Sequence, residues 1–133
     1  MSLSENVRNL VDQQPIVAVA TAALDGTPNV APIFWKLWYD DDTLLLLDNY
    51  MKTTKANIKA SGQASVSAWN AESGEGYQLK GAAEYFSEGL HMDAAVAHMD
   101  KQKPGTRPKG VVVLRIAQVY VQTPGEHAGE PLE

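Results

Sequence analysis

Apolar and polar positions alternate with a period of two residues through much of this chain. Between residues 63 and 69, for example, Ala64, Val66 and Ala68 fall on one face and serines on the other, as in a strand with one buried face. Six segments have this alternation or are rich in the residues that strands favour. We predict strands at residues 16–23, 29–39, 43–47, 63–69, 77–86 and 110–122.

Three short segments instead repeat their apolar residues with the period of a helix. We predict helices at residues 4–13, 54–61 and 88–100. Ser4 is placed to cap the first helix, and Gly62 suits the end of the second. In the third helix we expect Leu90, Ala94 and Ala97 to face inward.

Tight turns join most neighbouring strands, which favours antiparallel pairing. Asp25-Gly26 is a strong hairpin signal, and Asp40 to Asp42 form a second turn. A βαβ sheet would need a helix after nearly every strand, and this pattern is absent. We therefore predict a mainly β protein: a six-stranded antiparallel split β-barrel with about three short peripheral helices. Residues 1–123 are predicted to form one domain and residues 124–133 a flexible tail.

Composition narrows the partners and the chemistry. The chain has 133 residues and a formal net charge of −5, which disfavours nucleic acid or an acidic membrane as a partner. No apolar run reaches the roughly 20 residues of a membrane span and no secretory signal pattern is visible, so we predict a cytoplasmic protein. The absence of cysteine excludes disulfides, thiolate nucleophiles and iron–sulfur clusters. A non-covalent cofactor is then the simplest carrier for any redox chemistry.

Lysines and threonines gather at the start of the second predicted helix. Lys52, Lys55 and Lys59 are spaced for one side of the helix. Thr53 and Thr54 stand where the first helical N–H groups lack partners. Hydroxyls, free N–H groups and ammonium groups together favour an anion, above all a phosphate. A solvated basic face with a threonine cap explains this local pattern about equally well.

The predicted strand at residues 29–39 is rich in aromatic residues. Phe34, Trp35 and Trp38 follow closely on Pro32, which indicates a sheet edge, a strand start or a bulge. A flat apolar surface with backbone donors and acceptors suits an isoalloxazine ring. Taken alone, the aromatic strand is explained more simply by core packing.

Trp69 falls among serines on the polar face of its strand, which a dimer interface or a ligand wall explains better than free solvent. Together with Trp35 and Trp38 it exceeds what the core of a small monomer needs, so we predict a dimer. Gln78 either contacts the edge of a ring or only belongs to the polar face of an alternating strand. No catalytic residue and no metal site are predicted, because no triad, carboxylate pair or ligand set can be assembled.

In combination these segments resemble the FMN-binding split β-barrel superfamily, which is related to pyridoxamine 5′-phosphate oxidase, and most closely its short FMN-binding proteins. The resemblance covers roughly residues 5–121 and depends on the order and spacing of several short motifs. They are Val19-Ala20-Thr21, Asp25-Gly26, Val30-Ala31-Pro32, the segment 52–58 and the strand leading to Gly81.

The resemblance implies a homodimer with two FMN molecules at the subunit interface. It maps the flavin ring onto Ala31, Pro32, Ile33, Phe34, Trp35 and Lys36 of the second strand, and onto Leu47, Asp48 and Asn49 at the end of the third. It maps the phosphate onto Thr53 and Thr54, with Lys52 nearby, and suggests that Arg107 reaches the partner's flavin. The family often has lysine or arginine at the two threonine positions. The chain also lacks the extended C-terminal region of the vitamin B6 oxidases, so that activity is not expected.

Two functions remain open on the sequence. The first is an FMN-binding oxidoreductase or electron carrier with an unknown redox partner. The second is a non-enzymatic binding module of the same barrel class, which would hold haem, a deazaflavin or another ligand, because fold does not determine function.

Overall fold

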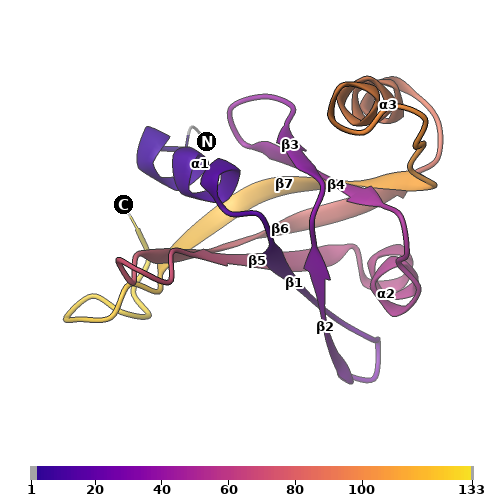
Figure 1. Cartoon of the computed structure of the whole chain (residues 1–133). Helices are drawn as coiled ribbons and strands as arrows, with labels where there is room; N and C mark the ends of the chain where they lie inside the picture. The colour runs from indigo at the N-terminus through magenta and orange to yellow at the C-terminus, as the bar shows by residue number, and fades with distance from the viewer. Residues whose placement is uncertain (1–2, 133) are drawn as a thin grey trace.

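The computed structural model describes residues 3–132, which form seven strands and three helices (Figure 1). In chain order they are α1 (Glu5–Gln13), β1 (Val17–Ala22), β2 (Pro28–Ile33), β3 (Lys36–Trp38), β4 (Thr43–Asp48), α2 (Thr53–Ser61), β5 (Gln63–Trp69), β6 (Gly76–Phe86), α3 (Leu90–Gln102) and β7 (Gly110–Val121). None of the helices in this part of the chain is long and apolar enough to span a membrane. Met1, Ser2 and Glu133 lie outside the described residues.

All seven strands belong to one antiparallel sheet in the order β2-β1-β5-β6-β7-β4-β3. The mainly β, split-barrel prediction is confirmed, with seven strands in place of six. The difference arises because the predicted strand 29–39 breaks at Phe34 and Trp35. Its first half, β2, pairs with β1, whereas its second half, β3, pairs with β4.

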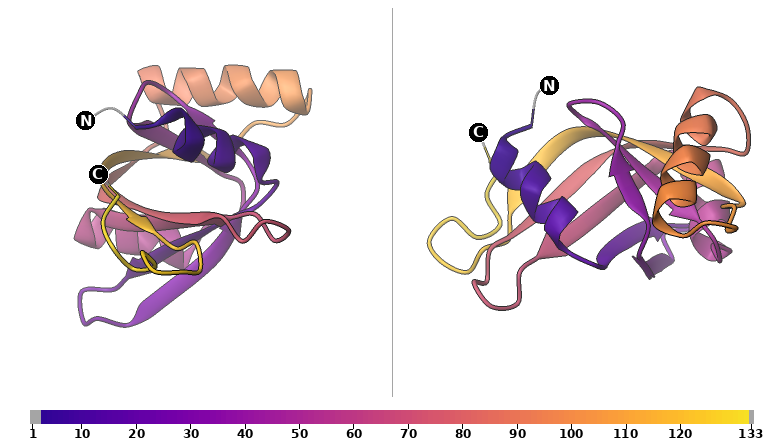
Figure 2. Two further views of the ribbon diagram at one scale, coloured as in Figure 1. Left: turned by 90° about the vertical axis from the view of Figure 1, so that its left-hand side faces the viewer. Right: turned by 45° about the horizontal axis from the view of Figure 1, so that its top comes forward.

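This break explains why the sheet closes on itself. β2 and β3 are the two outer strands of the sheet, yet only Phe34 and Trp35 separate them in the chain. Three peptide units span no more than roughly 11 Å, so the two edges must meet and the sheet must curl (Figure 2). Pro32 fits this arrangement, because β2 pairs on one side only and an edge strand tolerates a residue without an N–H group.

The apolar core has two parts, one inside the barrel and one on its outer surface. Leu44 and Leu46 of β4 point into the barrel, where they join Val112 and Leu114 of β7. The alternate β4 residues Leu45 and Leu47 pack on the outside against α3, through Met92, Ala95 and Met99. The uninterrupted leucine run of β4 therefore reflects burial of both faces.

The helix α3 does not present the face that the sequence predicted. Met92 and Met99 are buried, whereas Leu90 is 74% exposed and Ala97 is also exposed. The apolar pattern in this helix consists mostly of alanines, which mark a buried face only weakly. The long methionine side chains fill the gap over β4 and β7 instead.

Close backbone approach makes Gly81 necessary in β6. The pairing with β7 slips by one residue between Lys80 and Gly81, which is a β-bulge. A Cβ atom on Gly81 would lie 1.8 Å from the carbonyl oxygen of Arg115. Only glycine therefore lets β6 bend here without moving the neighbouring strand.

Residues 124–132, for which the sequence predicted a flexible tail, turn back along the end of β7. The N–H of Gly129 donates to the carbonyl of Val121, and the N–H of Leu132 donates to that of Val119. Pro131 also forms a bridge with Tyr120. The tail thus pairs with a part of β7 that extends beyond its partner β4.

Candidate functional site

A cavity of about 460 Å³ lies where β2 ends and β4 ends. It is lined by Pro32, Ile33, Phe34, Trp35, Leu47, Asn49, Tyr50 and Met51, and we call it the β2–β4 cavity. The barrel closure brings the two segments together, and the N–H of Leu47 donates to the carbonyl of Trp35 over 2.9 Å. Six of the fourteen residues that the sequence predicted for a cofactor are therefore side by side.

The lining of the β2–β4 cavity is mostly apolar and open to solvent. Phe34 is 57% exposed and Tyr50 is 92% exposed, which is unusual for large aromatic side chains in a folded domain. Val30, on the edge strand β2 that precedes Phe34, is 68% exposed. A contiguous apolar surface of this kind marks a place where a ligand or another chain binds.

Asp48 shapes the turn that carries three of the lining residues, although it does not itself line the cavity. Its side chain is buried, with 1% of its surface exposed. One carboxylate oxygen accepts the N–H of Met51 over 2.7 Å, and the other accepts the hydroxyl of Tyr85 over 2.5 Å. The backbone carbonyl of Asp48 accepts the N–H of Lys109 over 2.7 Å. Hydrogen bonds from Tyr85 of β6 and from Lys109, directly before β7, therefore hold the turn in place.

Tyr85 connects this turn to α2. Burial, and then its bond to Asp48, raise the pKa of the Tyr85 phenol above its ordinary value, so the hydroxyl stays protonated and remains a donor. The ammonium groups of Lys55 and Lys59 lie 4.7 Å and 5.5 Å from the centre of its ring. A Cβ atom on Gly110 would lie 2.2 Å from the hydroxyl oxygen, so the hydroxyl needs a glycine beside it.

The start of α2 follows the turn directly, and no side chain in the described residues caps it. Lys52 is the N-cap residue, and both Lys52 and Thr53 are exposed. Without a capping side chain, the first N–H groups of the helix are available to an anion. This arrangement places a donor-rich helix start within a few residues of the apolar cavity.

Thr54 is buried and belongs to a polar network beneath the helix. Its hydroxyl oxygen accepts the side-chain amide of Asn29 over 3.0 Å. The amide of Asn57 donates to the hydroxyl of Thr21 over 3.0 Å, and the amide of Asn29 also approaches that oxygen at 3.4 Å. The network ties α2 to β1 and β2, so Thr54 holds the helix in place. Its hydroxyl hydrogen can still donate.

Other predicted site residues do not line the cavity. Ala31 and Lys36 are not part of its lining. The ammonium group of Lys36 donates to the carbonyl of Gln14 over 2.6 Å, at the end of α1. Burial lowers the pKa of Lys36, and the charge of Asp12 partly opposes this shift. Arg107 is exposed in the loop between α3 and β7.

The three tryptophans, which the sequence suggested as dimer contacts, have different environments. Trp38 packs against the barrel core and donates its indole N–H to the carbonyl of Arg8 over 3.4 Å. Trp35 packs against the outer core under α3 while it also lines the cavity. Trp69 is 49% exposed, so it alone of the three is largely free for an interface.

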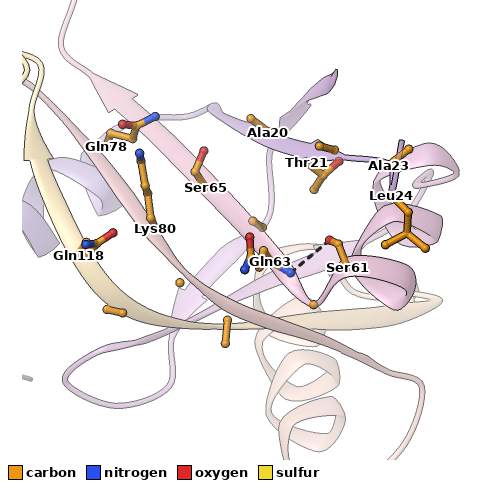
Figure 3. A pocket seen from close by; sticks show the side chains of 16 residues that line it. Ala20, Thr21, Ala23, Leu24, Ser61, Gln63, Ser65, Gln78, Lys80 and Gln118 are labelled. Atoms are coloured by element: carbon orange, nitrogen blue, oxygen red, sulfur yellow. Dashed lines mark hydrogen bonds between the residues drawn. The ribbon is translucent and has the colours of Figure 1, made fainter. Parts of the chain in front are cut away.

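A second hollow, of about 830 Å³, lies over β1, β5, β6 and β7 (Figure 3), and we call it the outer-sheet groove. Its floor consists of small residues and its walls carry amides and hydroxyls, together with Lys80. Lys80 lies opposite Ser65 on β5 and opposite Gln118 on β7. Gln78, which the sequence placed with the cofactor, lines this groove and not the β2–β4 cavity.

Several residues of this region are not among those that the sequence predicted. Tyr50 and Met51 line the cavity, and their place between Asn49 and Lys52, both predicted, was a usable signal. Tyr85 and Asn29 gave no such signal, because their partners are 37 and 25 residues away in the chain. Within residues 3–132, no group of three or more His, Asp or Glu side chains is placed to hold a metal ion.

Known proteins resemble this chain in sequence and in structure. A family model described as pyridoxamine 5′-phosphate oxidase matches residues 3–123. An uncharacterized protein from Methanocaldococcus jannaschii is 35% identical over 128 residues, which cover 95% of this chain and 84% of that protein. HupZ of group A Streptococcus has 27% identity and a TM-score of 0.83, over 96% of this chain and 99% of that one.

More distant structures share the fold. An FMN-binding protein from Syntrophomonas wolfei has 19% identity and a TM-score of 0.79, over 92% of this chain and 87% of that one. An F420 reductase, at 22% identity, and a haem-binding protein from Mycobacterium smegmatis, at 24%, have TM-scores of 0.66 and 0.67. The match to the F420 reductase covers 88% of this chain and 98% of the reductase chain. The match to the haem-binding protein covers 91% of this chain and 55% of that protein. From the match over nearly its whole length, this chain belongs to the pyridoxamine 5′-phosphate oxidase family.

Proposed function

We propose that this protein binds FMN and acts as an oxidoreductase or an electron carrier. The observation that carries the proposal is the β2–β4 cavity, an open apolar surface that leads directly into the uncapped start of α2. FMN has the same two parts, a flat apolar ring and a phosphate. The FMN-binding protein from S. wolfei has the same fold, which is consistent with this assignment.

The ring would lie along the end of β2 and the turn after β4. Phe34 and Tyr50 offer exposed aromatic surface, and Asn49 offers an amide for the polar edge of the ring. Ala31 and Lys36 flank this stretch and would contribute backbone groups. Asp48 would act through the turn that it holds and not by direct contact.

The phosphate would bind at the start of α2. Free N–H groups of the first turn, the exposed hydroxyl of Thr53 and the ammonium group of Lys52 supply donors and positive charge there. Thr54 would position the helix through Asn29 and donate its remaining hydrogen.

A homodimer with the cofactor at the interface accounts for the exposed apolar residues around both hollows. Phe34 and Tyr50 border the cavity, Leu24 lines the outer-sheet groove with 79% of its surface exposed, and Trp69, at the end of β5, is 49% exposed. In such a dimer Arg107, and Gln78 from the outer-sheet groove, would reach the flavin of the partner. Sedimentation at tens of micromolar protein tests this part, and a monomer would rule it out.

Bound FMN would supply the electron transfer chemistry, and the protein would bind it, orient it and limit its access to water. Titration of the purified protein with FMN tests the proposal. We expect a saturable change in flavin absorbance and quenching of flavin fluorescence at micromolar concentrations, with weaker binding of riboflavin. The absence of any saturable change would reject FMN as the ligand.

The second candidate is a binding module for haem or a deazaflavin. The haem-binding protein and the F420 reductase of the same fold motivate it, and so do threonines at positions where the family often has basic residues. A Soret band on addition of haem, with no response to FMN, would favour haem. Fluorescence changes with a deazaflavin alone would favour the deazaflavin.

A further inference from the structure

Positive charge is concentrated in two short segments of this acidic protein. Residues 52–59 and 101–109 contain seven of the eleven lysines and arginines and no acidic residue. The remaining 116 residues contain four basic and sixteen acidic residues. Such a separation creates a strong local potential that the net charge of −5 conceals.

The fold brings the two segments to the same end of the barrel (Figure 1). Lys109 donates its N–H to the carbonyl of Asp48, and Gly110 pairs with Asp48 across β7 and β4. Lys55 and Lys59 lie over Tyr85, whose hydroxyl bonds the same Asp48. We call this surface the basic end; it consists of Lys52, Lys55, Lys59, Lys101, Lys103, Arg107 and Lys109.

The charges of the basic end are not neutralised within the described chain. No carboxylate in residues 3–132 forms an ion pair with any of the seven, and all except Lys55 are exposed. Three of them lie near aromatic rings, which leaves their positive charge in place.

The basic end adjoins the β2–β4 cavity. The ammonium group of Lys109 lies 5.8 Å from the ring centre of Tyr50, and Lys52 directly follows Met51. Tyr50 and Met51 both line the cavity. A negatively charged partner that is attracted to this end is therefore brought to the mouth of the proposed flavin site.

We infer that the basic end docks an acidic redox protein, which exchanges electrons with the flavin one at a time. This inference rests on the proposed function. A single phosphate needs only one or two cations, so seven exceed what the cofactor requires. A long nucleic acid duplex would also run past acidic residues elsewhere on the surface, whereas a compact acidic protein meets this end alone. When reduced flavin is oxidised, it releases two protons to water and gives up two electrons, and two one-electron acceptors each gain one electron.

The first test does not need the flavin. We expect poly-L-glutamate, added to the cofactor-free protein at 50 mM salt, to shift backbone amide NMR signals of residues 52–59 and 101–109 and few others. A double variant, Lys59→Gln with Lys103→Gln, should weaken this binding about fivefold or more. The control, Asn6→Asp with Asn9→Asp on the exposed face of α1, changes the net charge equally and should alter it less than about twofold.

The second test uses the FMN-loaded, chemically reduced protein and two small one-electron acceptors. We expect ferricyanide, an anion, to be reduced about three- to tenfold more slowly by the Lys59/Lys103 variant than by the control variant. Hexaammineruthenium(III), a cation, should not be slowed, and high salt should abolish the difference. Failure to load FMN would count against the proposed function and not against docking, which the first test decides.

Two results would overturn the inference. One is equal behaviour of the two double variants in the first test, or in the second test once FMN is loaded. The other is binding of a 20-base-pair DNA duplex that the Lys59/Lys103 variant loses at 150 mM salt while its ferricyanide rate is unchanged. The second result would assign the basic end to nucleic acid.

Discussion

The two ends of this barrel are built differently. At one end α1 closes the barrel with apolar side chains, and Val7, Leu10 and Val11 are almost completely buried. At the other end Asp48, Tyr85 and the Asn29–Thr54 pair hold a turn and a helix start through long-range hydrogen bonds between side chains. Apolar burial provides most of the stability, whereas directional bonds define the geometry that a ligand site needs. Stability and ligand binding should therefore respond to different mutations.

The largest expected effect is at the closed end. Leu10→Ala should lower the free energy of unfolding by about 2–4 kcal/mol, because Leu10 is buried and the change leaves a cavity. Urea titration measures the loss. FMN affinity of the folded variant should stay within about twofold of the original. A large fall in affinity in the fully folded variant would show that the two ends are coupled.

The next effect is at the site end. Tyr85→Phe leaves the buried carboxylate of Asp48 without one donor and should lower the free energy of unfolding by about 1–3 kcal/mol. It should also weaken FMN binding, because the turn 48–51 loses a support. Tyr77→Phe is the matched control, since Tyr77, at the start of β6, donates over 2.8 Å to Glu75, which is less buried than Asp48, and does not line the cavity. If both variants affected FMN equally, the special role of Asp48 and Tyr85 would be rejected.

A smaller effect concerns the phosphate alone. Lys52→Gln should weaken FMN by about 1 kcal/mol, or roughly fivefold, and leave riboflavin unchanged, because only FMN has the phosphate that the cation attracts. Lys59→Gln removes the same charge from the last turn of the same helix and serves as the control. Isothermal titration with both ligands separates the cases. Equal losses for FMN and riboflavin would remove Lys52 from the phosphate site.

The smallest effect is a pH dependence. The pKa of Tyr85 is raised in the folded protein, first by burial and then by Asp48, so above pH 10 the unfolded chain releases this proton before the folded one does. The stabilisation from Tyr85 is therefore complete below pH 10 and decreases above it. The stability difference between the original protein and Tyr85→Phe should narrow from pH 10 to 11.5 in urea titrations. A constant difference would show that the phenol titrates normally.

The sequence predicted most of the elements because their signals are local. The strand alternation, the Asp25-Gly26 hairpin and the Gly62 helix end depend on neighbours in the chain, and all of them are present. Local patterns alone favoured core packing for the aromatic strand and an anion site for the segment after the leucine run. Only the resemblance to a known family assigned these two segments to one ligand.

The tertiary structure decided what depends on distant partners. Whether residues 29–39 form one strand or two depends on which neighbours pair with each half, and the curl of the sheet sets those neighbours. The inward turn of Thr54 depends on Asn29, and the burial of Asp48 depends on Tyr85. A sequence pattern records the propensity of a residue, but the partner of a buried polar group is chosen when remote segments pack together, because only then does it lose water and need a bond.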